Sequence, residues 1–165
     1  MCKLQLSDFC YGAFLSAFVK APVLFDETGS RRIYCLETNS EKDCWFMVKY
    51  VKELKNKNDQ FSHWLFNFTD AEVEKLQELR AEKERVKLAL ICLKEGWSGS
   101  ELAIVDYEDA ADCLGISRGI KNYRINIKAF NKKHGLRIYG SGRNDKVDSK
   151  DNTLKISRQE LSMLR

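Results

Sequence analysis

The sequence has no run of about 18 apolar residues, the length that a helix needs to cross a bilayer. Its most apolar early segment, residues 11–19, is short, lies behind Asp8 and lacks the basic region that opens a signal peptide. The sequence therefore predicts neither a membrane span nor a secretory leader, and we expect no membrane partner.

Patterns for metal ions and disulfides are missing too. The six cysteines form no Cys-x-x-Cys pair, and the two histidines, His63 and His134, stand 71 positions apart. Cys10, Cys35 and Cys92 lie within apolar segments, where a thiol behaves as a small hydrophobic group. We therefore expect reduced structural cysteines in a cytoplasmic protein, with no metal and no other cofactor. A zinc site and a disulfide framework are the alternatives.

Catalytic motifs are equally scarce. Gly96-Trp97-Ser98-Gly99 follows a predicted strand, but it is too short for a Walker or dinucleotide loop and has no lysine. Residues 140–143, Gly-Ser-Gly-Arg, can form either an amide nest for a phosphate or, as we favour, a hairpin loop. The acidic cluster at residues 106–112 suits the start of a helix, whose dipole stabilises carboxylates. The sequence predicts no catalytic residue and leaves enzymatic activity open.

The spacing of apolar residues along the chain predicts an α/β (α+β) protein. We expect a mixed sheet flanked by two main helices, followed by a C-terminal antiparallel β meander. Hydrophobic residues make up 44% of the chain, which is enough for a core. Residues 1–116 are expected to form an α/β core, and residues 117–165 a basic β extension packed on the same domain. The expected helices cover residues 7–20, 69–85 and 108–114, and the expected strands cover residues 23–25, 33–36, 45–51, 61–68, 86–93, 102–106, 123–128, 136–139 and 154–157.

Two of these helices carry clear local signals. In the first, apolar residues cover nearly the whole circumference, so we expect it to be buried on most sides, and Pro22 ends it. In the second, Thr69 and Glu72 form a capping box, in which each side chain satisfies a free amide of the first turn. The charged face of this helix, from Glu72 onward, is expected to be solvated.

Charge changes sign along the chain. Residues 1–116 carry 15 Lys/Arg and 20 Asp/Glu, whereas residues 117–165 carry 13 and 4, so a body near −5 precedes a tail near +9. Such asymmetry points to a surface that binds a polyanion. In the tail, period-two alternation places apolar residues on one face of a sheet and basic residues on the other. The predicted nucleic-acid-binding residues are Arg118, Lys121, Arg124, Lys128, Arg137, Tyr139, Arg143 and Lys155.

Non-catalytic binding of DNA or RNA through residues 118–158 is the leading interpretation. The cationic side chains would displace counterions from phosphates, and Tyr139 would stack on an exposed base. Two alternatives need no partner: the polar face protects the sheet from aggregation, or the basic tail docks on the acidic body at residues 101–112. A further alternative is a protein–protein module, such as an inhibitor, immunity or regulatory subunit, anchored by Trp45, Trp64 or Trp97.

One family resemblance bears on catalysis. The order helix, three strands, helix, strand over residues 7–93 resembles the core of the restriction-endonuclease-like family, whose metal-dependent members carry an Asp and then Glu-x-Lys on the central hairpin. The matching strand reads Met47-Val48-Lys49 and supplies the lysine without the carboxylate. Divalent ions that activate water need paired carboxylates, so the resemblance implies an inactive, degenerate nuclease-like protein. Any remaining activity would depend on Mg²⁺ or Mn²⁺ and on Lys49.

Overall fold

A computed structural model describes residues 3–18, 20–29, 31–37, 43–55 and 60–158 of the chain. These residues form three helices, α1 (Leu6–Ser16), α2 (Asp70–Glu82) and α3 (Tyr107–Leu114), with a 3₁₀ turn at Ile116–Arg118. The strands are β1 (Val23–Thr28), β2 (Arg31–Leu36), β3 (Cys44–Lys52), β4 (Phe61–Asn67), β5 (Arg85–Leu93), β6 (Glu101–Asp106), β7 (Arg124–Phe130), β8 (Gly135–Gly140), β9 (Lys146–Val147), β10 (Lys150–Asp151) and β11 (Leu154–Ser157).

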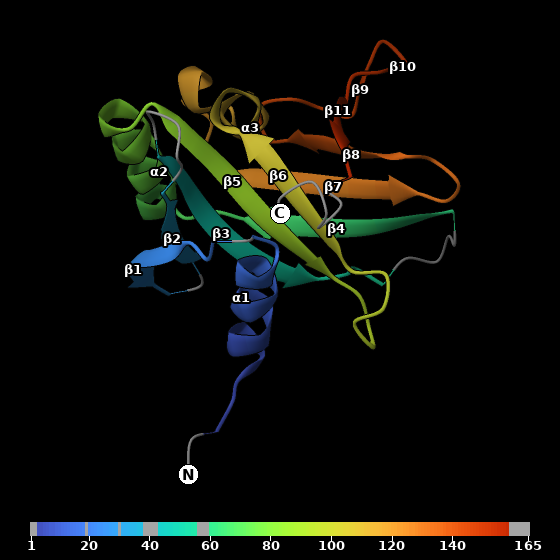
Figure 1. Cartoon of the computed structure of the whole chain (residues 1–165). Helices are drawn as coiled ribbons and strands as arrows, with labels where there is room; N and C mark the ends of the chain where they lie inside the picture. Colours follow the sequence, from blue (N-terminus) through green and yellow to red (C-terminus); the bar gives the residue numbers. More distant parts are fainter. Residues whose placement is uncertain (1–2, 19, 30, 38–42, 56–59, 159–165) are drawn as a thin grey trace.

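The long strands form two sheets that share one buried layer (Figure 1). Sheet A has the order β1-β2-β3-β5-β6, in which β3 and β5 are parallel and the other neighbouring pairs are antiparallel. Sheet B has the order β11-β8-β7-β4 and is antiparallel throughout. Strands β9 and β10 form a separate small hairpin. The predicted mixed fold with a C-terminal antiparallel meander is confirmed.

Strand β4 departs from the simple order expected for residues 7–93. Four strands separate α1 from α2, as the expected strand ranges have it and one more than the restriction-endonuclease-like order contains, and β4 does not join sheet A but pairs with β7 of sheet B. Within sheet A the order helix, three strands, helix, strand is kept, because β4 and α2 together form the crossover between the parallel strands β3 and β5. A strand from the first part of the chain therefore lies beside the strands of the basic part.

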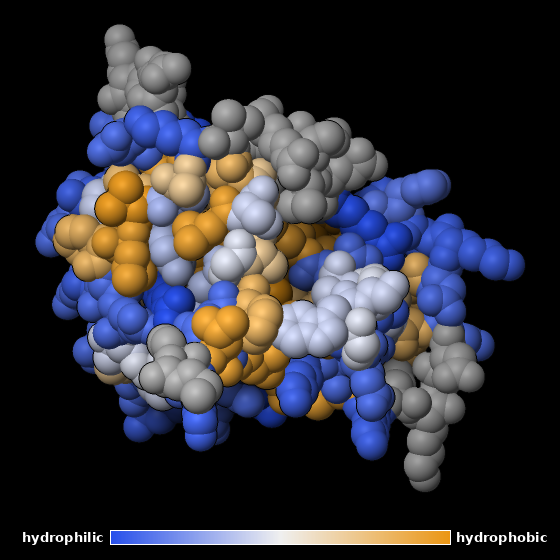
Figure 2. Space-filling model, turned by 60° about the horizontal axis from the view of Figure 1, so that its bottom comes forward, coloured by the Kyte–Doolittle hydropathy of each residue, from blue (hydrophilic) through white to orange (hydrophobic). Residues whose placement is uncertain are grey.

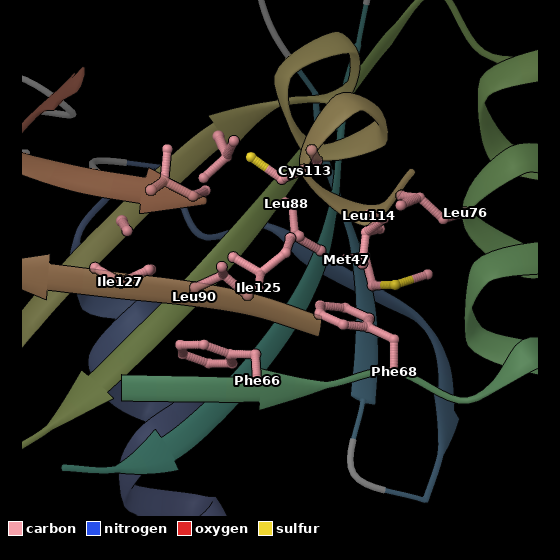
Figure 3. Packing of buried hydrophobic residues seen from close by; sticks show 14 of the residues in the cluster. Met47, Phe66, Phe68, Leu76, Leu88, Leu90, Cys113, Leu114, Ile125 and Ile127 are labelled. Atoms are coloured by element: carbon pink, nitrogen blue, oxygen red, sulfur yellow. The ribbon is translucent and has the colours of Figure 1, made fainter. Parts of the chain in front are cut away.

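The main core lies between the two sheets, with β5 at its centre. Leu88 and Leu90 of β5 face sheet B and share one buried cluster with Phe66 of β4 and Ile125 of β7 (Figure 3). Residues of α2 and α3 complete this cluster. The intervening residues of β5 face α1 on the other side of sheet A. Because β5 is covered on both faces, its sequence is a continuous apolar run, as expected for a central strand.

Helix α1 is shorter and less buried than predicted. Cys10, Tyr11 and Phe14 are buried against sheet A, whereas Phe9 is 51% exposed. The prediction of a helix buried on most sides is therefore wrong. In the described structure α1 packs on one layer, the outer face of sheet A, so only one stripe of its apolar residues is covered.

The capping box at the start of α2 is confirmed, and it belongs to a buried ion pair. The Thr69 hydroxyl accepts from the Glu72 amide at 3.2 Å, and the Glu72 carboxylate accepts from the Thr69 amide at 2.9 Å. Lys49 of β3 donates to both carboxylate oxygens of Glu72, at 2.7 and 2.8 Å, and to the carbonyl of Asn67 at 2.8 Å. Glu72 is thus buried rather than solvated, unlike the other acidic side chains of α2.

This ion pair holds the first turn of α2 against β3. Burial lowers the pKa of the Lys49 ammonium, and the hydrogen bonds to Glu72 oppose that shift. Each ion has lost its water, so either one left alone would be an unpaired buried charge. Breaking the pair therefore costs more than the pair itself contributes to stability.

Replacement of Lys49 alone by Met should lower the free energy of unfolding by about 3–5 kcal/mol, because Glu72 would keep a buried charge without a partner. The double variant Lys49→Met, Glu72→Gln should lose clearly less, since Gln is neutral and retains the capping box. Urea unfolding followed by circular dichroism measures both. The control Lys75→Met removes an exposed pair with Glu78 and should cost less than about 1 kcal/mol. Equal losses for Lys49→Met and Lys75→Met would contradict this account.

Candidate nucleic-acid interface

Sheet B turns one face to the core and the other to solvent. Along β7, Ile125 and Ile127 are fully buried, whereas Arg124, Asn126 and Lys128 alternate with them and point outward. This is the period-two arrangement that the sequence predicts. The outward face of sheet B, defined by the outward residues of β4, β7, β8 and β11, is the candidate site.

The pairing register brings several predicted residues together on this face. Tyr139 of β8 lies opposite Asn126, and Arg137 lies between Lys128 of β7 and Lys155 of β11. Side chains directly opposite each other on one face are close neighbours. Five of the eight predicted residues therefore share this face: Arg124, Lys128, Arg137, Tyr139 and Lys155.

Strand β4 adds two aromatic side chains to the face that the sequence analysis did not assign. The Phe61 ring centroid lies 5.2 Å from the Lys128 ammonium, which in turn lies 4.8 Å from the Tyr139 ring centroid. His63 shares a 2.9 Å hydrogen bond with the side chain of Asn126. The aromatic residues at 61–68 predict a strand, but they do not reveal which sheet the strand joins.

Two predicted residues, Arg118 and Arg143, point instead toward the acidic body. Both contact the carboxylate of Asp112 in α3, at 3.4 and 2.9 Å. Arg118 also donates to the carbonyl of Gly142, and Arg143 donates to the carbonyl of Asn152 at 2.7 Å. These two contacts agree with the alternative interpretation, in which the basic tail docks on the acidic body at residues 101–112.

Two further cations are partly neutralised on the face itself. Lys128 lies 3.2 Å from a carboxylate oxygen of Asp145, and Arg137 lies 3.5 Å from one of Asp151. Burial acts to lower the pKa of Lys128, but hydrogen bonds to Tyr139 and Asp145 more than offset it, so its pKa lies above the usual value. Lys128 therefore remains charged and is held in place between two aromatic rings.

A groove of about 580 Å³ lies at one end of the face, and Lys155 is not among the residues that line it. Lys121, Arg124 and Lys146 line it together with Tyr139, and none of these three cations forms an ion pair with another described residue. The groove also contains side-chain amides that can donate and accept hydrogen bonds, from Asn122, Asn126 and Asn144, and one carboxylate, from Asp145. Lys146 is a groove residue that the sequence analysis left outside the predicted set.

The glycine-rich segment 140–143 forms one wall of the groove and does not offer an amide nest. Its four amides donate within the chain, to the carbonyls of Arg143, Arg124, Cys113 and Gly140. The Ser141 hydroxyl accepts from the Arg124 amide and donates to the Asn122 carbonyl, both at 2.7 Å. The favoured interpretation, a hairpin loop, agrees with this geometry, and the loop fixes Arg124 beside the end of β8.

Lys49, the residue that matches the lysine of the nuclease motif, belongs to a structural ion pair. Lys49 is held by Glu72 from α2, and Asp26 is paired with Arg31 at 2.8 Å. Within the described ranges, no three His, Cys, Asp or Glu side chains lie together in a group that could hold a metal ion.

The three tryptophans suggested as protein anchors differ in exposure. Trp64 is fully buried and donates to the Leu93 carbonyl at 3.0 Å, so the prediction that it is an exposed anchor is wrong. Trp45 is half-buried, with Phe25 on one side and Lys83 within 4.7 Å of its ring centroid. Trp97 alone of the three is exposed, at 51%.

Gly142 should tolerate no side chain, because a Cβ there would lie 2.3 Å from the Cα of Gly115. We expect Gly142→Ala to lower the free energy of unfolding by about 1–3 kcal/mol through overpacking. Gly12→Ala in α1 is the matched control. Its Cβ would meet nothing within 4 Å, so the helix should gain roughly 0.5–1 kcal/mol. Thermal unfolding of both variants checks this, and a Gly142→Ala protein as stable as the parent would refute the tight contact between the glycine that ends α3 and the loop after β8.

No protein-family model matches this chain, and no curated protein or solved structure is significantly similar to it. No helix in the described part of the chain is long and apolar enough to span a membrane.

Proposed function

We propose that this protein binds nucleic acid, without acting on it chemically, through the outward face of sheet B. The observation that carries the proposal is the groove where Lys121, Arg124 and Lys146 lie beside Tyr139 without ion-pair partners among the described residues. Cations that no carboxylate neutralises are available to phosphates. An aromatic ring beside them offers a surface for a base.

Phosphate contact would supply most of the affinity. Each cation that replaces condensed counterions on a phosphate backbone releases them, and this release favours binding at low salt. Lys128, Arg137 and Lys155 continue the positive charge from the groove across β7, β8 and β11. Their carboxylate partners, Asp145 and Asp151, are surface groups whose ion pairs contribute little, so phosphates can compete for these cations.

A single strand fits this face better than a duplex. Tyr139 and Phe61 lie in the surface of a sheet with Lys128 between them, so their rings can meet only bases that are not already stacked in a helix. The amides of Asn122, Asn126 and Asn144 line the same groove and can hydrogen-bond the edges of an unpaired base.

The other five predicted residues fall into two groups by role. Lys121, Arg124 and Tyr139, joined by Lys146, would contact the ligand in the groove. Arg118 and Arg143 would shape the groove indirectly, because they tie Gly142 and the loop after it to Asp112. A cytoplasmic location remains part of the proposal, since five described cysteines are free thiols and four of them are buried.

The double variant Lys121→Gln, Arg124→Gln should weaken binding to every sequence tested. For a single strand each phosphate contact contributes about 0.7 to the slope of log K against log salt, so loss of two contacts should reduce the slope by about 1.4. Fluorescence anisotropy with a labelled oligonucleotide at several salt concentrations measures this. Lys20→Gln, Lys75→Gln is the control, because it removes the same charge elsewhere on the surface. Tight binding by the parent protein with no dependence on salt would refute the proposal.

Tyr139→Ala should weaken binding of a single strand by about 1–3 kcal/mol, roughly 5- to 150-fold, because a stacking surface is lost. Tyr139→Phe should retain most of the affinity, since it removes only the hydroxyl that interacts with Lys128. A matched duplex should bind more weakly than the single strand and should respond little to either change. If Phe is as harmful as Ala, Tyr139 does not act by stacking.

A further inference from the structure

A second pocket, of about 870 Å³, lies at the opposite end of sheet B from the groove. Phe61 and Ser62 line it at the start of β4, whereas the groove lies beside Arg124, which pairs with Asn67 at the end of β4. Its size is within the roughly 300–1,000 Å³ of pockets that hold small molecules. Helix α1 and the β5–β6 turn supply part of the lining, and Figure 2 brings their side of the molecule forward, where hydrophobic and polar surface lie side by side.

The backbone of residues 53–54, which line this pocket, joins the two sheets. The Glu53 amide donates to the Leu93 carbonyl at the end of β5, and the Leu54 amide donates to the His63 carbonyl in β4, both at 2.8 Å. The segment after β3 is therefore fixed to sheet A and to sheet B. A ligand here would contact backbone that is already ordered, which lowers the entropic cost of binding.

Ser62 places an unsatisfied hydroxyl at this pocket. The residue is only 7% exposed, it lines the pocket, and its side chain has no hydrogen-bond partner among the described residues. By contrast, the Ser100 hydroxyl in the β5–β6 turn accepts from the Lys94 amide at 2.9 Å. Buried hydroxyls are nearly always hydrogen-bonded, and a polar group of a ligand would supply the missing partner of Ser62.

Trp97 offers the pocket a flat aromatic surface. It stands in the β5–β6 turn with φ at 70°, a left-handed conformation that bulky residues rarely adopt, and the residue is 51% exposed. The Trp97 amide donates to the Lys94 carbonyl at 3.1 Å, and the ring of Phe9 packs against the indole at 66°, with 5.7 Å between the centroids. The loop from Gly96 to Gly99, which is no Walker motif, thus holds an indole beside the pocket.

The charges around the pocket favour an anion that also carries hydrogen-bond donors. Lys52, Lys55 and Lys94 line it, and none of them forms an ion pair with another described residue. They outnumber the two carboxylates of the lining, from Glu53 and Glu95. Ammonium groups bind phosphate, and carboxylates accept hydrogen bonds from hydroxyl or amino groups.

We infer that this pocket binds a nucleotide, with the base on Trp97, the phosphate at the lysines, and Ser62 and Glu53 hydrogen-bonded to polar groups of the ligand. Inorganic phosphate would leave Trp97 unused, and an uncharged apolar molecule would leave the lysines unused. The same chemistry has two sources, a free nucleotide and one unit of a strand on sheet B, because Phe61 lines the pocket and also lies beside Lys128 of the outward face. Only the second source rests on the proposed function.

Isothermal titration calorimetry with adenosine 5′-monophosphate (AMP) tests the pocket. The parent protein should bind AMP about 5- to 150-fold more tightly than ribose 5-phosphate, because the base adds a stacking contact. Trp97→Gly should remove this difference, and glycine suits the left-handed backbone, so the turn is retained. The control Leu4→Gly changes a residue that is 68% exposed and does not line the pocket, and it should bind like the parent. AMP binding no tighter than that of ribose 5-phosphate, or unchanged in Trp97→Gly, would overturn the inference.

Ser62→Ala separates a role in binding from a role in folding. It should weaken AMP binding about 2- to 10-fold and leave the thermal midpoint of unfolding unchanged, because the hydroxyl has no described partner to lose. Thr69→Ala is the reciprocal control, since its hydroxyl accepts from the Glu72 amide, so it should lower the midpoint and leave AMP binding intact. A Ser62→Ala protein that is destabilised but binds AMP like the parent would overturn the role of Ser62.

A single-stranded oligonucleotide distinguishes the two sources. If it displaces AMP from the parent but not from the Lys121→Gln, Arg124→Gln variant, a unit of the bound strand occupies the pocket. If AMP still binds to the protein saturated with oligonucleotide, the free nucleotide is the ligand. Both results support the pocket. AMP binding without oligonucleotide binding would reject the proposed function alone, and oligonucleotide binding without AMP binding would reject the pocket alone.

Discussion

The buried layer shared by sheets A and B determines which faces of the molecule can serve a function. Sheet A uses both of its faces for packing, one against α1 and one against sheet B, which explains the continuous apolar sequence of β5. Sheet B uses only one. Its inward residues, such as Ile125 and Ile127, are fully buried, and the alternating residues are left to solvent because the pleat gives them no other direction. The outward face is therefore a direct consequence of how the core is formed.

The basic residues on and around that face have two different roles. Arg118 and Arg143 form ion pairs with Asp112 of α3. These two basic residues of the tail therefore hold the loop after β8 against α3. Lys121, Arg124 and Lys146 lie on the other side of the same loop and have no such partner in the described structure. Docking of the tail on the body and availability of cations for a ligand are thus compatible, because different residues are involved. A count of charges along the sequence cannot separate the arginines that pair with Asp112 from the cations that line the groove.

Local signals in the sequence were reliable where short-range chemistry decides the outcome. The Thr69–Glu72 capping box, the alternation along β7 and the apolar run of β5 each predicted the observed element, because each depends on neighbours a few residues away. Long-range partners could not be predicted in this way. Nothing near Lys49 in the sequence indicates that Glu72 will be its counter-ion, and nothing in residues 61–67 indicates that β4 will join the basic strands. The candidate site shares this limit, since alternation identified its outward residues but not which carboxylates would reach them.

The edges of the two sheets differ in the residues that they expose. The last strand of sheet B, β11, carries Lys155 on its exposed face, a residue type that discourages pairing between chains, whereas β1 of sheet A carries Val23, Leu24 and Phe25. The groove cations would meet a phosphate without losing an ion pair to another described residue, whereas Lys128 and Arg137 would first have to give up Asp145 and Asp151. Binding at sheet B would therefore begin at the groove, and it would extend across β7 and β8 only as phosphates displace these two surface carboxylates.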